Sequence, residues 1–293
     1  MSTANAKIKT LFFIEGNGGG AITHTLTLAR FLDKKAFEPS IVFFSDGPSV
    51  EQARRLNIDF SLVPRRFDLD FTLIWRLSRI IKKRQIDILH THTITGNFYA
   101  RCAAYLLPRR PLLFTTLHSF VIDELRGDTG VTFKDYLRYK RDIWLSGLSD
   151  QFIAVTNGLK DKLIENGVPS QKVEVILNGI APASQLRDSN ADAKLKRQLG
   201  IQQNAHVVTV IGRFVPLKNH SLFLKAARIL NDAPEAHFLL IGDGPLRNSL
   251  EKTAEALGLS RKTTFTGWQN DLAAYYGITD VLVQCSLTES QGL

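Results

Sequence analysis

The first residues in the sequence that could do chemistry form a glycine-rich loop. Gly16, Gly18, Gly19 and Gly20 follow an apolar run, and an amphipathic segment begins immediately after them. Glycine allows the backbone to approach a ligand closely, and the positive end of a following helix attracts phosphate. The loop therefore favours phosphate binding at Gly18–Gly20, although the same residue types also form tight turns that bind nothing.

The same loop is compatible with a second kind of enzyme. Gly16, Gly18 and Ala21 satisfy the dinucleotide pattern G-x-G-x-x-G/A, and Asp46 ends the next apolar run. A nicotinamide-dependent enzyme therefore stays open as an alternative interpretation.

Three histidines lie where predicted strands end. His90 and His92 are two residues apart, so their side chains point to the same side of a strand, and His118 ends a later strand in TTLHS. Two histidines at this spacing could begin a metal site, but no Cys, Asp or third His lies nearby in the sequence to complete one. We therefore expect no metal. The histidines are interpreted either as hydrogen-bonding residues at strand ends or as substrate contacts.

Charged residues follow two strands in the second half of the sequence. Arg213 and Lys218 lie on one strand-to-helix loop, and Glu289 lies on the loop after the last apolar run. The planar fork of an arginine and the point charge of a lysine can together hold a diphosphate. A transferase that releases a nucleoside diphosphate needs such fixed cations, because negative charge develops on its leaving oxygen.

Parallel sheets are expected to position these residues, because short β-branched apolar runs alternate with longer amphipathic segments. The predicted strands are 8–15, 39–46, 60–64, 86–92, 112–118, 151–156 and 173–177, then 206–212, 236–241, 263–266 and 281–285. The predicted fold class is α/β, with two Rossmann-like doubly wound domains facing a cleft. The second domain is expected to be incomplete, because its last strand is followed by a loop and no closing helix.

The alternation breaks at 180–204, a polar and partly helical stretch that we interpret as the interdomain segment. It divides the 293 residues into domains 1–183 and 184–293.

The formal net charge of +9 suits an anionic substrate or an anionic membrane surface. Nucleic acid is not expected as a partner, because the positive charge is not interleaved with aromatic residues in a known reader motif. Segments 72–84 and 133–145 combine basic with apolar or aromatic residues, so they are either ordinary surface helices or membrane-docking helices. No apolar run approaches the about 20 residues that span a bilayer.

Cys102 and Cys285 are expected to be buried free thiols, which fits a reducing compartment.

Taken in this order, the motifs resemble those of the family 4 glycosyltransferases, which have the GT-B fold. The resemblance covers essentially the whole chain. It is most specific after Val210, in IGRFVPLKNH, LLIGDGPLRNSLE and FTGWQNDLAAYYGITDVLVQCSLTESQGL. The glycine loop, the segment ILHTHTITGNFYAR, His118 and VILNGI also look like their family counterparts.

The resemblance implies roles for the candidate residues. His118 would contact the transferred sugar, and Glu289 would contact the donor sugar as the first carboxylate of an E-x(7)-E motif; these two are the catalytic candidates. Arg213 and Lys218 would hold the donor diphosphate, and Gly18–Gly20 would approach the donor diphosphate or the acceptor. Transfer would retain configuration and use a nucleoside diphosphate sugar as co-substrate, with no metal and no other cofactor. Domain 1–183 would be the acceptor side, and domain 184–293 would bind the donor.

The sequence also departs from the family pattern. Asn219 follows Lys218 where the family often has Gly, and Ala181 follows VILNGI where Asp is common. The second glutamate of the motif would lie eight residues after Glu289, beyond Leu293, so the resemblance implies a C-terminally truncated chain. The segment 68–70, Asp-Leu-Asp, is interpreted as a helix-capping loop rather than a metal-binding D-x-D.

The expected function is transfer of a sugar to a glycan or lipid-linked acceptor in the synthesis of cell-surface polysaccharide or lipopolysaccharide. The expected location is the cytoplasm, with peripheral attachment to the inner face of the cytoplasmic membrane. An inactive truncated remnant of such an enzyme is one alternative, and the nicotinamide-dependent enzyme is the other.

Overall fold

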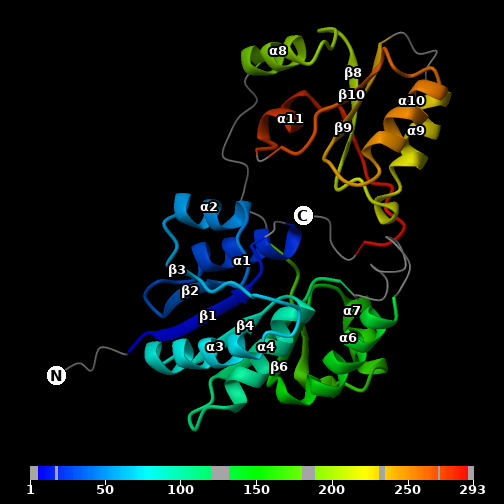
Figure 1. Cartoon of the computed structure of the whole chain (residues 1–293). Coiled ribbons are helices and arrows are strands. Elements are labelled where there is room, and N and C mark those ends of the chain that lie inside the picture. The colour runs from blue at the N-terminus through cyan, green and yellow to red at the C-terminus, as the bar shows by residue number, and fades with distance from the viewer. Residues whose placement is uncertain are drawn as a thin grey trace. The chain divides into compact units, whose positions relative to one another are not determined.

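In the computed structural model, the structure describes residues 6–16, 19–119, 132–179, 189–230, 235–269 and 271–289. These residues fall into two compact units, unit 1 (6–179) and unit 2 (189–289). Each unit is a parallel β-sheet with helices on both faces (Figure 1). The predicted domain boundary at 183/184 lies outside the described residues.

Unit 1 contains a seven-stranded parallel sheet in the order β3-β2-β1-β4-β5-β6-β7. Its strands are β1 (Ile8–Ile14), β2 (Phe37–Phe43), β3 (Phe60–Leu62), β4 (Ile88–Thr91), β5 (Leu112–Leu117), β6 (Gln151–Ala154) and β7 (Val173–Val175). Its α-helices are α1 (Gly20–Phe31), α2 (Pro48–Arg55), α3 (Phe71–Arg84), α4 (Ile94–Tyr105), α6 (Phe133–Trp144) and α7 (Asn157–Glu165). The seven strands predicted for this half of the sequence are all present.

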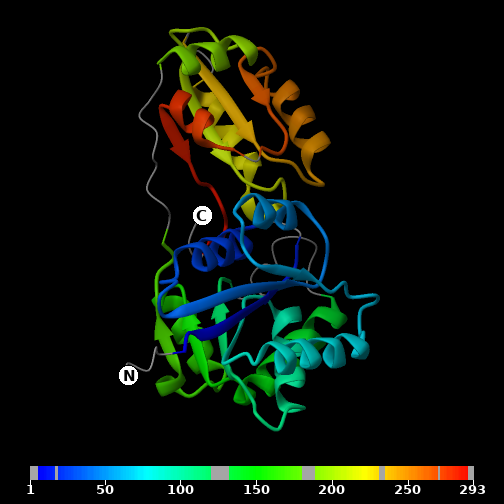
Figure 2. The same cartoon turned by 90° about the vertical axis from the view of Figure 1, so that its left-hand side faces the viewer.

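Alternate residues of β1 build two apolar layers. Leu11 and Phe13 belong to a cluster with α3 and α4, whereas Phe12 and Ile14 belong to a cluster with α1 and α2. Because successive side chains of a strand point to opposite faces, helices cover β1 on both sides. Figure 2 shows α1 and α2 on one side of the sheet and α3 and α4 on the other. The strand order reverses between β1 and β4, which is where ligands bind in such sheets.

Unit 2 contains a four-stranded parallel sheet in the order β10-β9-β8-β11. Its strands are β8 (His206–Ile211), β9 (Ala236–Ile241), β10 (Thr263–Phe265) and β11 (Val281–Val283). Its α-helices are α8 (Ser189–Gln198), α9 (His220–Ile229), α10 (Arg247–Ala256) and α11 (Ala273–Ile278). Helices α9 and α10 pack on one face of the sheet, and α8 and α11 pack on the other. The order reverses between β8 and β11, so the four strands predicted for this half form a second doubly wound sheet.

The structure corrects the interpretation of 180–204 as an interdomain segment. Residues 189–204 are part of unit 2, because Leu195 and Leu199 pack with the buried side chain of Ile201 against the β9 residues Leu239 and Ile241. The segment contains few apolar residues, but the spacing of Leu195 and Leu199 places both on one face of a helix. A short amphipathic helix at the start of a domain was thus mistaken for a linker.

The segment 68–70 caps a helix, as predicted. The side chain of Asp70 accepts a hydrogen bond from the backbone N–H of Thr72 at 3.0 Å, which is an N-cap contact at the start of α3. Asp70 is fully buried and pairs with Arg76 at 2.8 Å. Its carboxylate therefore bonds to the first turn of α3 and to Arg76 within the same helix.

Candidate active site

Histidines from three neighbouring elements converge at the carboxyl edge of unit 1. His90 lies near the end of β4 and His92 just after it, His118 follows β5, and His24 lies on α1 behind β1. The Nδ1 atom of His92 and the Nε2 atom of His118 are 3.2 Å apart, and His90 Nε2 lies 2.8 Å from Thr116 Oγ1. The rings of His90 and His92 stack with centroids 4.4 Å apart, which confirms that they point to the same side. Because β1, β4 and β5 are adjacent, residues far apart in sequence form one cluster.

Burial keeps this cluster uncharged. Desolvation, with smaller contributions from the neighbouring imidazoles, lowers the pKa of His90 and that of His118 to about 3 each. The same cause holds the pKa of His92 well below its usual range, and burial also lowers the pKa of His24. At neutral pH these rings are neutral, so each offers one N–H donor and one nitrogen lone pair.

The glycine-rich loop is partly explained by packing inside unit 1. A Cβ atom on Gly16 would lie 2.4 Å from the carbonyl oxygen of Ser45, so this position has no room for a side chain. Gly19 is the N-cap of α1, with a φ of 114° that favours glycine, and Gly20 is the first residue of the helix. Gly18 lies outside the described residues. Gly16 is therefore fixed by close approach of the loop after β2, whereas Gly19 lies at an uncapped helix end.

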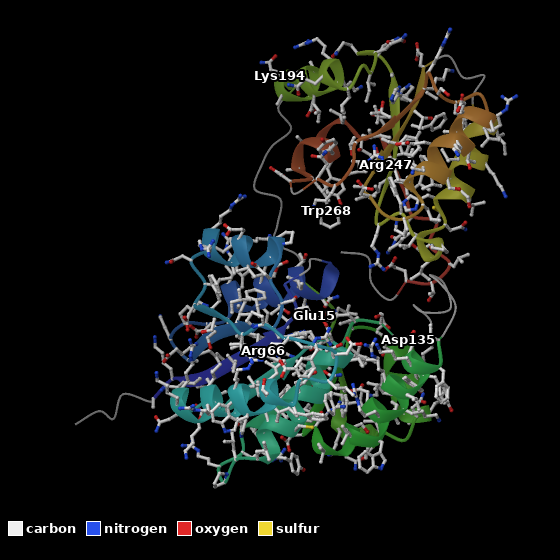
Figure 3. All side chains as sticks on the ribbon, in the orientation of Figure 1. Glu15, Arg66, Asp135, Lys194, Arg247 and Trp268 are labelled. Atoms are coloured by element: carbon white, nitrogen blue, oxygen red, sulfur yellow. The ribbon has the colours of Figure 1, made fainter. Side chains whose placement is uncertain are left out.

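Glu15 is a carboxylate that the sequence did not single out. It lies at the carboxyl end of β1, between the sheet and the glycine loop, and is labelled in Figure 3. Burial raises the pKa of its carboxyl group, while Arg65 and a hydrogen bond with Thr95 oppose that shift. A carboxyl group with a raised pKa at a strand end is a candidate for proton transfer.

Backbone hydrogen bonds lock together the loops at the carboxyl edge of unit 2. The N–H of Gly212 donates to the carbonyl of Ile241 at 2.9 Å, and the N–H of Phe214 donates to that of Asp243 at 2.9 Å. Gly242, with a φ of 140°, has no space for a side chain, since its Cβ atom would lie 2.0 Å from the Gly212 oxygen. The turn after β9 therefore fixes the loop after β8, which carries Arg213 and Lys218.

The structure brings Lys218 and Glu289 together. They form an ion pair between the loops that follow β8 and β11, which is the point where the strand order of unit 2 reverses. The N–H of Leu287 donates to the carbonyl of Leu217 at 2.8 Å and so holds the two loops side by side. Arg213 is exposed at the start of the same β8 loop. Three of the predicted site residues thus lie on two neighbouring loops of one sheet.

Asn219 explains how the chain departs from the family pattern at this position. Its φ of 51° and ψ of 40° place it in the left-handed region, where glycine is favoured and asparagine is the best tolerated alternative. The next residue, His220, is buried and contacts the Phe214 ring edge-on at 4.9 Å. Burial, followed by the charge of Lys218, lowers the pKa of His220 to about 4. Ala181, the second departure, lies outside the described residues.

Sequence reasoning missed His24, which is 68 residues before His92 and 94 before His118. Its distance along the chain hid it, and only the strand order brings it to the other histidines. One signal in the sequence was available. His24 follows the glycine loop by about one helical turn, so its side chain remains near the carboxyl edge of β1.

The two edges present polar groups of different chemistry. The edge of unit 1 offers neutral imidazoles and hydroxyl groups, which suit the hydroxyls of a sugar. The edge of unit 2 offers Arg213, Lys218 and Glu289, which suit a diphosphate next to a hydroxylated group. Two doubly wound units with these sites define the class of GT-B glycosyltransferases.

Comparison with known proteins places the chain within that class. Residues 18–184 match the family model Glycosyltransferase Family 4, and residues 191–293 match Glycosyl transferases group 1. The chain belongs to glycosyltransferase family 4, which confirms the resemblance inferred from its motifs. This assignment favours the glycosyltransferase interpretation over the nicotinamide-dependent alternative.

Among curated relatives, the UDP-Gal:alpha-D-GlcNAc-diphosphoundecaprenol alpha-1,3-galactosyltransferase of Escherichia coli is 30% identical over 234 residues, covering 76% of this chain and 58% of that protein. The lipopolysaccharide core biosynthesis glycosyltransferase LpsD of Rhizobium meliloti is 25% identical, covering 97% and 74%. Among solved structures, Anabaena HepE in complex with UDP and glucose superposes with a TM-score of 0.80 at 19% identity, covering 97% and 76%. That likeness confirms the fold.

The chain spans only part of several relatives, with 57% to 62% of the length of three that it matches. No helix within the described ranges is long and apolar enough to cross a membrane.

Proposed function

We propose that this protein transfers a sugar, with retention of configuration, from a nucleoside diphosphate sugar to a glycan or lipid-linked acceptor. The observation that carries the proposal is the Lys218–Glu289 pair at the strand-order reversal of unit 2, with Arg213 on the same β8 loop. In doubly wound sheets this position is where ligands bind.

The two cations and the carboxylate have different proposed tasks. Arg213 and Lys218 bind the diphosphate and stabilise the charge that develops on the leaving oxygen, and Glu289 accepts hydrogen bonds from hydroxyls of the donor sugar. The ion pair holds both side chains in place before the donor arrives, which limits the reorganisation that binding requires. Protein cations alone neutralise the leaving group in this scheme, so transfer requires no metal.

The acceptor side is proposed to be the carboxyl edge of unit 1. There, His118 contacts the transferred sugar through a neutral ring that both donates and accepts hydrogen bonds, while Gly19 and Gly20 at the start of α1 approach the donor diphosphate or the acceptor. The activities of the relatives described above, a UDP-Gal-dependent galactosyltransferase and a lipopolysaccharide core glycosyltransferase, support a UDP-sugar donor and synthesis of a lipid-linked or lipopolysaccharide glycan.

Nucleotide binding tests the donor half of the proposal directly. UDP, GDP, ADP and NAD⁺ are titrated separately into the protein by calorimetry, and a nucleoside diphosphate, UDP first, is expected to bind. Arg213→Ala and Lys218→Ala should each weaken that binding by about 10- to 100-fold, the range expected for hydrogen bonds to charged groups. Lys225→Ala is the matched control, because Lys225 is an exposed cation on α9 away from the β8 loop.

The outcomes separate the alternatives. Preferential binding of NAD⁺ would overturn the donor assignment in favour of a nicotinamide enzyme. Equal loss in all three variants would show that only general positive charge matters, and would remove Arg213 and Lys218 from the site.

We further propose that unit 1 docks on an anionic membrane surface at the inner face of the cytoplasmic membrane. Helices α3 and α6 pack on either side of α4, and both expose aromatic residues among their basic ones. Trp75 is 57% exposed with Arg79 over its ring, and Trp144 is 82% exposed. Exposed aromatics combined with basic residues are the pattern of an interfacial helix.

Co-sedimentation with vesicles tests this docking. The protein should bind phosphatidylglycerol vesicles and not phosphatidylcholine vesicles, and Trp75→Ala with Trp144→Ala should lower the bound fraction severalfold. Trp268→Ala is the matched control, because Trp268 is also exposed but belongs to unit 2. Equal binding to both vesicle types would argue against an anionic surface.

A further inference from the structure

The histidine cluster of unit 1 brings three ring nitrogens close together, which the proposed contact of His118 with a sugar does not explain. One ring nitrogen from each of His24, His92 and His118 lies within 4.8 Å of the corresponding nitrogens of the other two. Three imidazole nitrogens that converge to this extent are the ligand set of sites such as the three-histidine zinc centre. Sequence spacing alone did not reveal this set, because His24 lies on α1 while His92 and His118 follow β4 and β5.

The spacing can be compared with that of a bound ion. Two nitrogens bound to one tetrahedral Zn²⁺ at 2.0–2.1 Å lie about 3.3 Å apart. The His92 Nδ1 and His118 Nε2 atoms, at 3.2 Å, already have that separation. The remaining separations have to close by at most about 1.5 Å from their upper bound of 4.8 Å, which small ring rotations can supply.

An orphaned atom is the second, independent observation. His92 is 4% exposed, yet its Nε2 atom has no hydrogen-bond partner within the described part of the protein. A buried polar atom without a partner costs about 1–3 kcal/mol, and a metal ion would remove this cost where it binds His92 through Nε2 rather than through Nδ1. The rings are also neutral, and neutral imidazole is the form that binds metal.

We propose that His24, His92 and His118 form a binding site for a divalent transition-metal ion of the Zn²⁺ class. Three nitrogen ligands leave a fourth coordination position for water or a ligand oxygen. The site goes beyond the proposed transfer reaction, which needs no metal. Where His118 contacts the donor sugar, a bound ion occupies that ring and inhibits transfer; this consequence alone rests on the proposed function.

Metal binding can be measured without any sugar donor. Co²⁺ is titrated into tag-free protein and followed by its visible absorption, and Zn²⁺ is titrated by calorimetry, both in a Cys102→Ala/Cys285→Ala background that removes the two thiols. One ion per chain is expected, with the intense absorption bands of four-coordinate Co²⁺. Zn²⁺ should displace the Co²⁺.

Single variants assign the ligands. His24→Gln, at a half-exposed position, should weaken binding by at least about tenfold, since even an outer hydrogen-bond partner of a metal ligand contributes that much. His92→Gln should have at least the same effect, and circular dichroism verifies that each variant is folded. The matched control is His206→Gln, because His206 is exposed on β8 of unit 2.

Two results would overturn the proposal: absence of a stoichiometric Co²⁺ complex, or a complex that His24→Gln leaves unchanged. In either case the cluster is a hydrogen-bonded chain of neutral histidines. UDP titration of the same preparations reports separately on the donor site, so failure of the metal site and failure of the proposed transfer are distinguishable.

Discussion

The carboxyl edges of the two units differ in the contacts that surround their candidate site residues: paired histidine and threonine side chains in unit 1, and backbone hydrogen bonds together with the Lys218–Glu289 ion pair in unit 2. In unit 1, His90 pairs with Thr116 and His92 pairs with His118. In unit 2, the N–H of Gly212 donates to Ile241 and that of Leu246 donates to Phe214. The geometry of the unit 1 edge therefore depends on ring orientation and proton position, and that of unit 2 depends on the absence of side chains at its glycines.

The difference suits the chemistry proposed for each edge. A diphosphate site needs cations at fixed positions, and backbone hydrogen bonds fix the β8 loop that carries Arg213 and Lys218. A site for sugar hydroxyls needs groups that both donate and accept hydrogen bonds, and neutral rings supply them. We therefore compare a side-chain substitution in unit 1 with a substitution of Gly242 in unit 2.

The largest effect is expected from Arg101→Met in unit 1. Arg101 is fully buried on α4, and its guanidinium pairs with the Asp142 carboxylate at 2.6 Å and contacts Ser149 at 3.0 Å. Removal of one partner leaves a buried unpaired charge, so the free energy of unfolding of unit 1 should fall by about 3–5 kcal/mol. Hydrogen exchange of unit 1 peptides, measured by mass spectrometry, gives this value.

Removal of both charges provides the control for Arg101→Met. The double variant Arg101→Met/Asp142→Leu should recover most of the loss, because a well-packed apolar pair replaces a buried ion pair at little cost. If the double variant is as unstable as the single one, packing of the Arg101 side chain rather than its charge holds α4 to α6.

The corresponding change in unit 2 is Gly242→Ala. The added Cβ atom would lie 2.0 Å from the Gly212 oxygen, so the β8 loop must move, at a cost of about 3 kcal/mol in the stability of unit 2. Gly258→Ala is the matched control: Gly258 also has a positive φ, 71°, but its Cβ atom would meet nothing within 4 Å, so about 1 kcal/mol is expected. Hydrogen exchange of β8 and β9 peptides reports both. Equal losses would mean that φ alone, and not the close approach, constrains Gly242.

The two edges also differ in how far the sequence predicts them. Arg213 and Lys218 are five residues apart on one loop, so local spacing was enough to predict that both cations follow β8, where the structure places them. Glu289 is 71 residues beyond Lys218, and its role followed only from the family resemblance; the structure places the two in an ion pair. All strands of both sheets were predictable from their short apolar runs, although only the central strands, such as β1 and β9, are buried along most of their length.

The limits of sequence reasoning have physical causes. The histidine cluster depends on strand order, which no local pattern specifies, so His24 was missed. The stretch 180–204 was predicted to be partly helical, but few residues of α8 are apolar, and only the tertiary contacts reveal that Leu195 and Leu199 pack in unit 2. The roles of His118, Arg213, Lys218 and Glu289 toward a donor stay predictions.

A catalytic variant separates the two edges functionally. His118→Ala removes a ring proposed to contact the transferred sugar but not the diphosphate, so turnover should fall by about tenfold, equivalent to one hydrogen bond. The affinity for UDP should stay unchanged, whereas Arg213→Ala lowers it. Turnover of a UDP-sugar is measured with a chelator present, so that bound metal does not contribute. A matching loss of UDP affinity in His118→Ala would place the ring at the diphosphate instead.

The smallest predicted effect is a change of stability with pH. It tests whether the carboxyl edge of unit 2 contains a histidine whose pKa is lowered by burial, as in unit 1. His220 is 2% exposed, and burial with the charge of Lys218 lowers its pKa to about 4. The unfolded chain takes up this proton near pH 6.5 and the folded unit only near pH 4, so stability is highest above about pH 6.5 and falls as the pH drops toward 4. Between pH 7.5 and 5.5 this one group should lower the free energy of unfolding by about 1 kcal/mol.

His220→Leu removes the titrating group, and neither ring nitrogen has a hydrogen-bond partner to lose within the described residues. Urea denaturation at the two pH values should therefore show a difference that is smaller by about 1 kcal/mol in His220→Leu than in the parent. An unchanged difference would mean that His220 has the same pKa in the folded unit as in the unfolded chain, and that burial does not lower it.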